Sequence, residues 1–256
     1  MSIALAMSCE KVIQIPLNDA ARKVVVEMEV KSFPGDNWVR LSKSGSMYDD
    51  SGYERLSGAE ITVTDKDGAT FVFDETAEAG MYHHPTFEVL PNNSYNLSVT
   101  VDGKEIVGHA DTYATAEIDT IYYELVENVF GPIFGDTTDS IIQMKYSFQD
   151  DPARKNYYIR RSRINGGDYR AVSFNDDLWD GQQVDGTMSN LEPNKGDTIF
   201  TELMTVDEGV YSFFESLSEN TTSNVTPANP VSNLDGDALG YFGVFCVDTI
   251  TLIIPE

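Results

Sequence analysis

Short segments in which apolar and polar residues alternate run along most of the chain, which is the pattern of β-strands with one buried face. In the first half they cover residues 22–31, 38–42, 58–64, 70–73, 95–100 and 104–107. Turn residues such as Pro34-Gly35, Asp67-Gly68 and Asp102-Gly103 separate them. Strands at such short and regular spacing predict an antiparallel β-sandwich of about 100 residues.

A second series of strand-like segments begins near residue 119 and covers residues 141–148, 156–164, 198–206, 239–247 and 249–254. One segment has a different period. Asp207 is placed to cap a helix in which Val210, Phe214 and Leu217 lie about one turn apart, and Val206 and Tyr211 have the spacing of a hydrophobic staple. We therefore predict one helix, over residues 207–218.

These patterns predict an all-β chain of two antiparallel β-sandwich domains with one short helix in the second; a single elongated sandwich is the alternative. The domains are expected at residues 22–117 and 118–256, after a signal remnant, a lipidation cysteine and a tether in residues 1–21. Both sandwiches are expected to be Ig-like or transthyretin-like. The segment Gly58-Ala59-x-Ile61-x-Val63 before an Asp-Gly turn resembles transthyretin-like and carboxypeptidase-regulatory modules.

Composition narrows the possible partners. The 256 residues carry 17 Lys and Arg against 42 Asp and Glu, a net charge of −25. This charge opposes binding to nucleic acids and to anionic lipid head groups, which are polyanions themselves. No apolar run reaches the roughly 20 residues that a membrane-spanning helix needs, so we expect any membrane attachment to be covalent.

Cys9 offers such an attachment. It follows the apolar segment Ile3-Ala4-Leu5-Ala6-Met7-Ser8, which is similar to the end of a bacterial lipoprotein signal. Met1-Ser2 supplies no basic region before it, and a true start codon further upstream would explain this. The other cysteine, Cys246, lies in an apolar strand pattern, and we interpret it as a small buried side chain.

The densest group of polar side chains lies between Phe174 and Gly186, F-N-D-D-L-W-D-G-Q-Q-V-D-G. Asp and Asn bond their own backbone in turns, and Gly permits a positive φ, so the segment predicts an ordered loop anchored by Leu178 and Trp179. The residues assigned to this structural acidic loop are Phe174, Asn175, Asp176, Asp177, Trp179, Asp180, Gly181 and Asp185. A Ca²⁺ site built from Asp176, Asp177, Asp180 and Asp185 is the alternative interpretation.

Other candidate sites are less defined. His83 and His84 are adjacent, so on a strand they point to opposite faces and do not share a metal ion. The tripeptides at Asp119, Asp139, Asp197 and Asp248 read Asp-Thr/Ser-Ile, which predicts a loop ending as a strand starts. They also resemble the O-glycosylation sites of some Gram-negative envelope proteins. We find no G-x-S-x-G, H-E-x-x-H, P-loop or Rossmann motif and assign no catalytic residue.

Several segments together resemble one family. They are C-E-K-V-I at Cys9, S-G-A-x-I-T-V at Ser57, S-F-Q-D at Ser147, N-Y-Y-I-R at Asn156, F-N-D-D-L-W-D-G-Q at Phe174 and A-L-G-Y-F-G-V-F at Ala238. The family is the Bacteroidota outer-membrane lipoprotein family of unknown function DUF4249. The resemblance implies a lipid-anchored outer-membrane protein, at the cell surface or on the periplasmic face, that is associated with TonB-dependent transporters.

The expected function is therefore that of a non-enzymatic, lipid-anchored envelope protein, an accessory binding component of a TonB-dependent outer-membrane transporter. Its expected partner is that transporter or another envelope protein, with no cofactor other than the alternative Ca²⁺. Two other functions stay open. One is a glycan-active hydrolase that uses paired carboxylates, and the other is an adhesin-like structural module.

Overall fold

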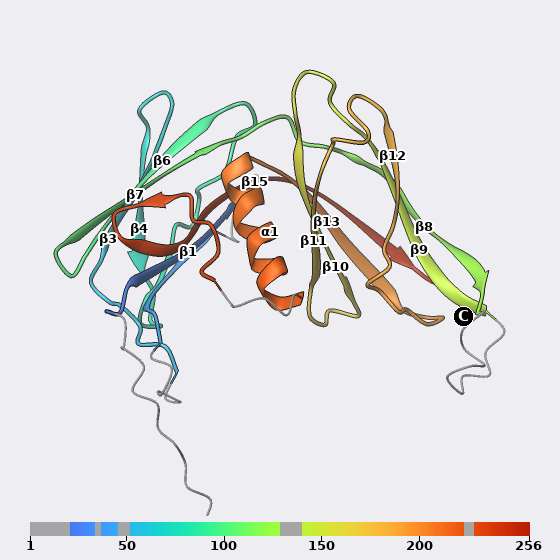
Figure 1. Cartoon of the computed structure of the whole chain (residues 1–256), viewed down its shortest axis with the longest axis horizontal. Helices are drawn as coiled ribbons and strands as arrows, with labels where there is room; N and C mark the ends of the chain where they lie inside the picture. The colour runs from blue at the N-terminus through green and yellow to red at the C-terminus, as the bar shows by residue number, and fades with distance from the viewer. Residues whose placement is uncertain (1–20, 34–36, 46–51, 129–139, 223–227) are drawn as a thin grey trace, which may run out of the picture.

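The computed structural model describes residues 21–33, 37–45, 52–128, 140–222 and 228–256 (Figure 1). Within them the chain is built of β-strands and a single helix, so the all-β prediction is confirmed. Figure 1 shows two β-rich halves side by side, with the helix α1 between them and the last strand running across both. Nearly every neighbouring pair of strands is antiparallel; β1 and β15 are parallel.

The first half encloses one hydrophobic core. Val24, Val26, Met28 and Val30 alternate with less buried residues along β1, which is the pattern of a strand with one buried face. The sheet continues from β1 in the order β2-β5-β4-β3-β6-β7-β14 and curls around this core. Its strands are β1 (Val24–Lys31), β2 (Trp38–Lys43), β3 (Glu60–Asp65), β4 (Thr70–Glu75), β5 (Met81–His83), β6 (Ser94–Val101), β7 (Lys104–Asp111) and β14 (Leu234–Asp235).

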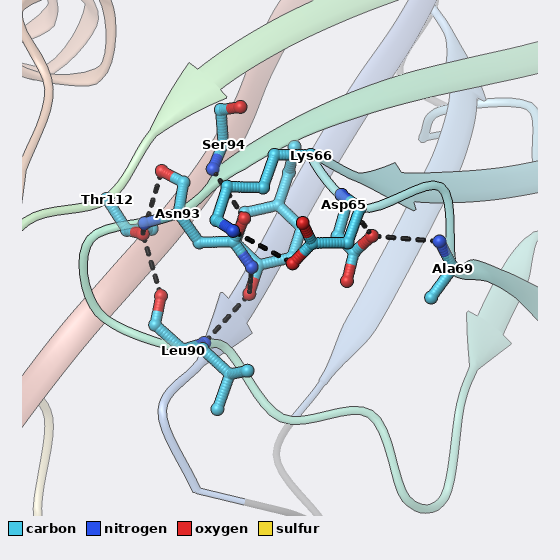
Figure 2. A network of polar contacts seen from close by, with 9 residues as sticks. Asp65, Lys66, Ala69, Leu90, Asn93, Ser94 and Thr112 are labelled. Carbon is cyan, nitrogen blue, oxygen red and sulfur yellow. Dashed lines mark hydrogen bonds and ion pairs between the residues drawn. The ribbon is translucent and has the colours of Figure 1, made fainter.

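A hydrogen-bonded corner holds the start of β6 in place (Figure 2). The backbone N–H of Leu90 donates to the hydroxyl of buried Tyr95, five residues further on, at 2.8 Å. The hydroxyl of Thr112 donates to the carbonyl of Leu90 at 2.7 Å, and the N–H of Asn93 donates to Thr112 at 2.9 Å. A tyrosine that bonds backbone a few residues upstream at a strand corner is a feature of Greek-key sandwiches.

The second half is a sandwich of two sheets. A three-stranded sheet, β12-β9-β8, faces the strands β11, β10, β13 and the end of β15, and a second hydrophobic core lies between them. This core includes Met144, Phe148, Tyr158, Ile199 and Leu203. The strands are β8 (Ile118–Glu127), β9 (Ser140–Gln149), β10 (Tyr157–Ile164), β11 (Arg170–Asn175), β12 (Gln183–Thr187), β13 (Thr198–Val206) and β15 (Ala238–Ile253).

The helix α1 (Glu208–Thr222) covers the outer face of this second sandwich. Val210 N–H donates to Asp207 Oδ1 at 2.8 Å, which is the bond of an N-cap residue. Val210 and Phe213 pack with Tyr157 and Phe245 in a third hydrophobic cluster. The predicted helix and its cap are confirmed, with the end four residues later. The helices of the described residues include none that is long and apolar enough to cross a bilayer.

The strand β15 joins the two halves, as Figure 1 shows. Ala238–Phe245 pairs in parallel with β1, and residues 246–253 pair antiparallel with β13. The prediction of two separate strands, 239–247 and 249–254, is wrong. Asp248 does not end a loop, because it lies inside the continuous strand β15. Its carboxylate accepts the N–H of Ile118, the first residue of β8, at 2.7 Å. Gly240 has φ +99, and a Cβ there would meet the Val26 carbonyl oxygen, so glycine permits the close β1–β15 approach.

Buried ion pairs add to this junction. Both terminal nitrogens of Arg161 on β10 donate to the carboxylate of Glu29 on β1, at 2.7 and 2.9 Å. The Tyr241 hydroxyl donates to the same carboxylate at 2.9 Å, and Lys31 pairs with Glu202 at 3.2 Å. Bidentate arginine–carboxylate pairs are among the strongest and most directional polar contacts. The predicted domain boundary at residues 117 and 118 stays a prediction. β15 lies in the second predicted domain but contributes residues to both hydrophobic cores.

Candidate functional site

The acidic segment is shorter as a loop than the sequence predicts. Phe174 and Asn175 end β11, and residues 183–186 belong to β12, so the connecting loop covers residues 176–182. Phe174 pairs with Tyr158 of β10, and Val184 pairs with Phe148 of β9. The prediction of one continuous loop from Phe174 to Gly186 is therefore wrong at both ends, because Phe174 and Val184 pack against the second core.

Asp176 fixes the start of this loop. Its carboxylate Oδ2 accepts the backbone N–H of Asn156 at 2.6 Å, and its own N–H donates to the Asn156 carbonyl at 3.2 Å. Its carbonyl then accepts the N–H of Trp179 at 2.7 Å. The side chain of Asp176 is buried, so the carboxylate supplies an acceptor that water does not reach.

Asp150, at the end of β9, fixes the other end. Its Oδ1 accepts the Tyr158 hydroxyl at 2.5 Å and its Oδ2 accepts the N–H of Gly181 at 2.7 Å. The Asp150 N–H donates to the Gln182 carbonyl at 3.0 Å. Gly181 has φ +66, and a Cβ there would lie 2.7 Å from the Pro152 Cβ. Sequence reasoning missed Asp150 as a partner of the loop, although the Asp150-Asp151-Pro152 turn signal marks the place.

The two apolar side chains of the loop have different roles. Trp179 packs against the second hydrophobic core, and its ring stands edge-on to Phe174 with centroids 6.4 Å apart. Its packing agrees with the predicted anchor, although the side chain is only partly buried. Leu178 is 77% exposed, so the prediction that it anchors the loop is wrong. The short loop directs only one of the two side chains towards the core.

Three carboxylates meet at this loop. Oxygen atoms of Asp150, Asp176 and Asp180 lie within 4.8 Å of one another. Of the four aspartates in the alternative Ca²⁺ set, the structure places Asp176 and Asp180 in this group. Asp177 instead pairs with Lys155 at 2.8 Å, and that hydrogen bond lowers the pKa of its carboxyl. Asp185 lies in β12, opposite Ser147 of β9 and outside the group.

This cluster of carboxylates could bind a cation or could hold the loop through hydrogen bonds. Clustered carboxylate oxygens are ligands for a hard cation such as Ca²⁺, which takes six to eight oxygens. Here both oxygens of Asp150 and one of Asp176 already accept hydrogen bonds from protein donors. Burial and the neighbouring Asp150 carboxylate raise the pKa of Tyr158, so its hydroxyl stays a donor. The contacts therefore favour the interpretation of a loop clamped by its aspartates.

A small recess borders the clamp. Its volume is about 290 Å³, and it lies between residues 114–119 and the turn after β9. Asp119, Asp150 and Asp151 contribute carboxylates to its lining, and Asn156 and Tyr158 contribute polar side chains. The recess is thus acidic on several sides, which is consistent with the net charge of the chain.

The remaining candidates do not join this site. His83 ends β5, whereas the ring of His84 lies against Phe71 and Phe73, so the two histidines do not form a pair. Cys246 is fully buried in the first core, as predicted, and burial raises the pKa of its thiol to about 11. Cys9 lies outside the described residues, and its lipidation stays a prediction.

The comparison with known protein families identifies the family of this chain. Residues 10–251 match the family described as a domain of unknown function, DUF4249. The chain belongs to this family. The DUF4249 match begins one residue after Cys9 and contains the first hydrophobic core, most of the second, the acidic loop and most of β15. The resemblance inferred from the sequence is confirmed at the level of the DUF4249 family.

Relatives of known function do not extend this identification. No curated protein matches the chain. Among solved structures, a two-domain fibronectin type III segment of chicken tenascin is 12% identical, with a TM-score of 0.25, over 73% of this chain and 91% of its own. Three fibronectin domains of chicken CNTN1 are 10% identical, with a TM-score of 0.28, over 93% and 69%. A Legionella pneumophila DUF4785 family protein is 9% identical, with a TM-score of 0.24, over 70% and 51%. These TM-scores are low, so no property is transferred from the three proteins.

Proposed function

We propose that this DUF4249 chain is a non-enzymatic, lipid-anchored envelope protein that assists a TonB-dependent outer-membrane transporter in capturing its cargo. Cys9 after Ile3-Ala4-Leu5-Ala6-Met7-Ser8 is the sequence feature that supports an acyl anchor. The net charge of −25 suits an exposed protein that stays soluble beside other envelope components.

The observation that supports the binding role is that buried aspartates fix the acidic loop through hydrogen bonds. Asp150 and Asp176 are buried and accept hydrogen bonds from the backbone of Gly181 and Asn156. These acids hold the loop in shape. Together with β15 and the Glu29–Arg161 pair, they support a rigid body that presents fixed surfaces to a partner.

Isolation of the complex tests this proposal. Full-length protein is expressed in its native envelope, extracted in mild detergent and purified through a tag at the C-terminus. We expect an outer-membrane transporter to co-purify with the wild type, and a Cys9→Ala variant to leave the membrane fraction and lose the transporter. Recovery of wild type without any envelope protein, or equal membrane retention of both forms, would contradict the proposal.

One observation keeps a hydrolase as the second candidate, namely the closeness of Asp150, Asp176 and Asp180. Glycosidases use two carboxyl groups at a defined separation, one as acid and one as nucleophile or base. A polysaccharide panel incubated with purified protein tests it. We expect no sugar release; release that disappears in Asp180→Asn would replace the binding role by a catalytic one.

A further inference from the structure

β8 is the longest of the strands that end a sheet. It ends the three-stranded sheet β12-β9-β8, and among the described strands it pairs with β9 alone (Figure 1). The other strands in such positions, β14, β12 and β11, have two, five and six residues, against ten in β8. The bond from the N–H of Ile118 to Asp248 of β15 holds the start of β8. The rest of the strand presents one row of backbone groups to no neighbouring strand.

The hydrogen bonds of β9 show which backbone groups of β8 form this row. The N–H of Met188 donates to the carbonyl of Met144, and this pair continues the register of β12 on β9. The backbone groups of successive residues in an antiparallel strand point to alternate sides. Met144 therefore bonds towards β12, and its neighbours Gln143 and Lys145 bond towards β8.

The partners of these two residues on β8 are Glu124 and Tyr122. The N–H and C=O groups of Tyr122 and Glu124 are therefore used inside the sheet. Those of Tyr123 and Leu125 point the other way, towards the free edge. No strand of the described residues pairs with β8 on that side. The free edge is thus defined residue by residue, and its open backbone groups belong to the odd-numbered positions.

The side chains at these odd-numbered positions are apolar. Ile121 and Tyr123 pack with the second hydrophobic core, and Leu125 follows them on the same face because side chains alternate along a strand. Leu125 is nevertheless 63% exposed, although its cross-strand partner Ile142 packs against that core. An apolar side chain on an added strand would lie beside Leu125 and remove it from water.

The charges of this edge are acidic. Asp119, Glu124 and Glu127 are exposed, and β8 contains no lysine, arginine or proline, which are residues that commonly protect edge strands from pairing. Lys145 of β9 lies 3.8 Å from Glu124 and offsets one of the three charges. The edge therefore favours a basic strand. It disfavours a second copy of this chain, which brings the same carboxylates and a net charge of −25.

We propose that β8 binds an extended basic segment of a partner protein, which adds a strand to the sheet along residues 121–127. The backbone of the segment bonds to Tyr123 and Leu125. Its side chains alternate, so that apolar ones cover Leu125 and basic ones face Glu124. This proposal goes beyond the proposed envelope role, because the contact needs neither the Cys9 anchor nor a transporter.

Synthetic peptides of the length of β8 test the partner's chemistry on the purified full chain. The first alternates valine with lysine, and the second alternates valine with glutamate. Fluorescence anisotropy of the labelled peptides measures binding. We expect the lysine peptide to bind at least about tenfold more tightly, because like charges on neighbouring strands repel. Absence of binding by the lysine peptide, or equal binding of both, would overturn the proposal.

Methylation of the peptide backbone tests strand addition itself. In an added antiparallel strand the valines lie on the inner face, and their N–H groups point to β8. Methylation of the valine nitrogens should therefore abolish binding. Methylation of the lysine nitrogens, which point away from β8, is the matched control and should leave binding in place. Equal effects of the two modifications would contradict pairing along this edge.

Amide hydrogen exchange followed by NMR locates the contact. In the free chain the amides of Tyr123 and Leu125 should exchange fast, whereas those of Tyr122 and Glu124 should be protected. Saturation with the lysine peptide should slow the first pair and leave the second unchanged. Protection of Tyr123 and Leu125 without peptide would overturn the proposal. If that protection grows with protein concentration and a dimer sediments, the occupant is a second copy.

A substitution tests the edge from the side of the protein. Leu125→Lys places a charge on the inner face of an edge strand, which natural proteins use against strand addition, and should weaken the lysine peptide about tenfold. Leu178→Lys is the matched control. Leu178 is also an exposed leucine, 77% accessible, in the loop that joins β11 and β12 at the other end of the sheet. Equal losses in the two variants would show an effect of net charge alone and would overturn the assignment.

Discussion

Burial decides what each aspartate of the acidic loop does. Asp150 and Asp176 are buried and accept backbone hydrogen bonds, while Asp177 and Asp185 face solvent. The sequence indicated an ordered, Asp-rich loop around Trp179, and this is what the structure shows. It could not indicate Asp150, because that residue lies 26 positions before Asp176 and meets the loop only through strand pairing.

Trp179 and Leu178 give a test at this scale. Trp179→Ala removes a side chain that packs on the second core and should lower the free energy of unfolding by about 3 kcal/mol. Leu178→Ala, in the adjacent exposed position, should change it by no more than about 0.5 kcal/mol. Urea unfolding followed by circular dichroism measures both. Equal losses would show that the loop does not pack as described.

Glu29 gives a pH dependence with a defined sign. Burial raises the pKa of its carboxyl, but the hydrogen bonds and charge of Arg161, with help from Tyr241 and Lys31, hold it below the ordinary 4.5. Because the folded pKa is depressed, the stabilisation is complete above the unfolded value and is lost as pH falls through the folded pKa.

The measurement compares wild type with Glu29→Gln in urea, from about pH 6 to about pH 3. The difference in unfolding free energy should be largest above pH 4.5 and should shrink as pH falls below it. A difference that stays constant across this range would mean that Glu29 is not held in its charged form by Arg161.

At the scale of elements, strand existence was predictable and strand continuity was not. The segments 198–206 and 141–148 alternate clearly, and both are strands. The short polar strands β11 and β12 carry too few apolar positions to show the pattern. For β15, Asp248 looked like a loop end, but its carboxylate is used by the Ile118 N–H of a different strand. Such long-range partners leave no mark in the local sequence.

The cap of α1 gives a prediction at this scale. Asp207 accepts the N–H of Val210 and, through its second oxygen, the N–H of Asp111 at the end of β7. Asp207→Ala leaves both donors without this acceptor and should cost about 1–2 kcal/mol. Asp207→Asn keeps an acceptor for Val210 and should lose less. Thermal melts of the two variants measure these losses. Equal stability of Asp207→Ala and the wild type would contradict the capping role.

At the scale of the whole molecule, composition and period were enough to predict an all-β chain, and the resemblance of several sequence segments pointed to the DUF4249 family. They were not enough to show that one strand, β15, serves both halves, or that Glu29 and Arg161 pair across them. These features arise where segments more than a hundred residues apart meet. The envelope location and the transporter partner remain proposals, which the co-purification experiment tests.

We infer that hydrogen bonds to Asp150 and Asp176, rather than a bound cation, hold the acidic loop in place. A thermal melt of the purified chain with chelator, with added Ca²⁺ and with neither tests it most directly. We expect the melting temperature of the wild type to be the same in all three conditions, and that of Asp180→Asn likewise to be unaffected by chelator or Ca²⁺. A melting temperature that falls with chelator, recovers with Ca²⁺ and no longer responds in Asp180→Asn would contradict it.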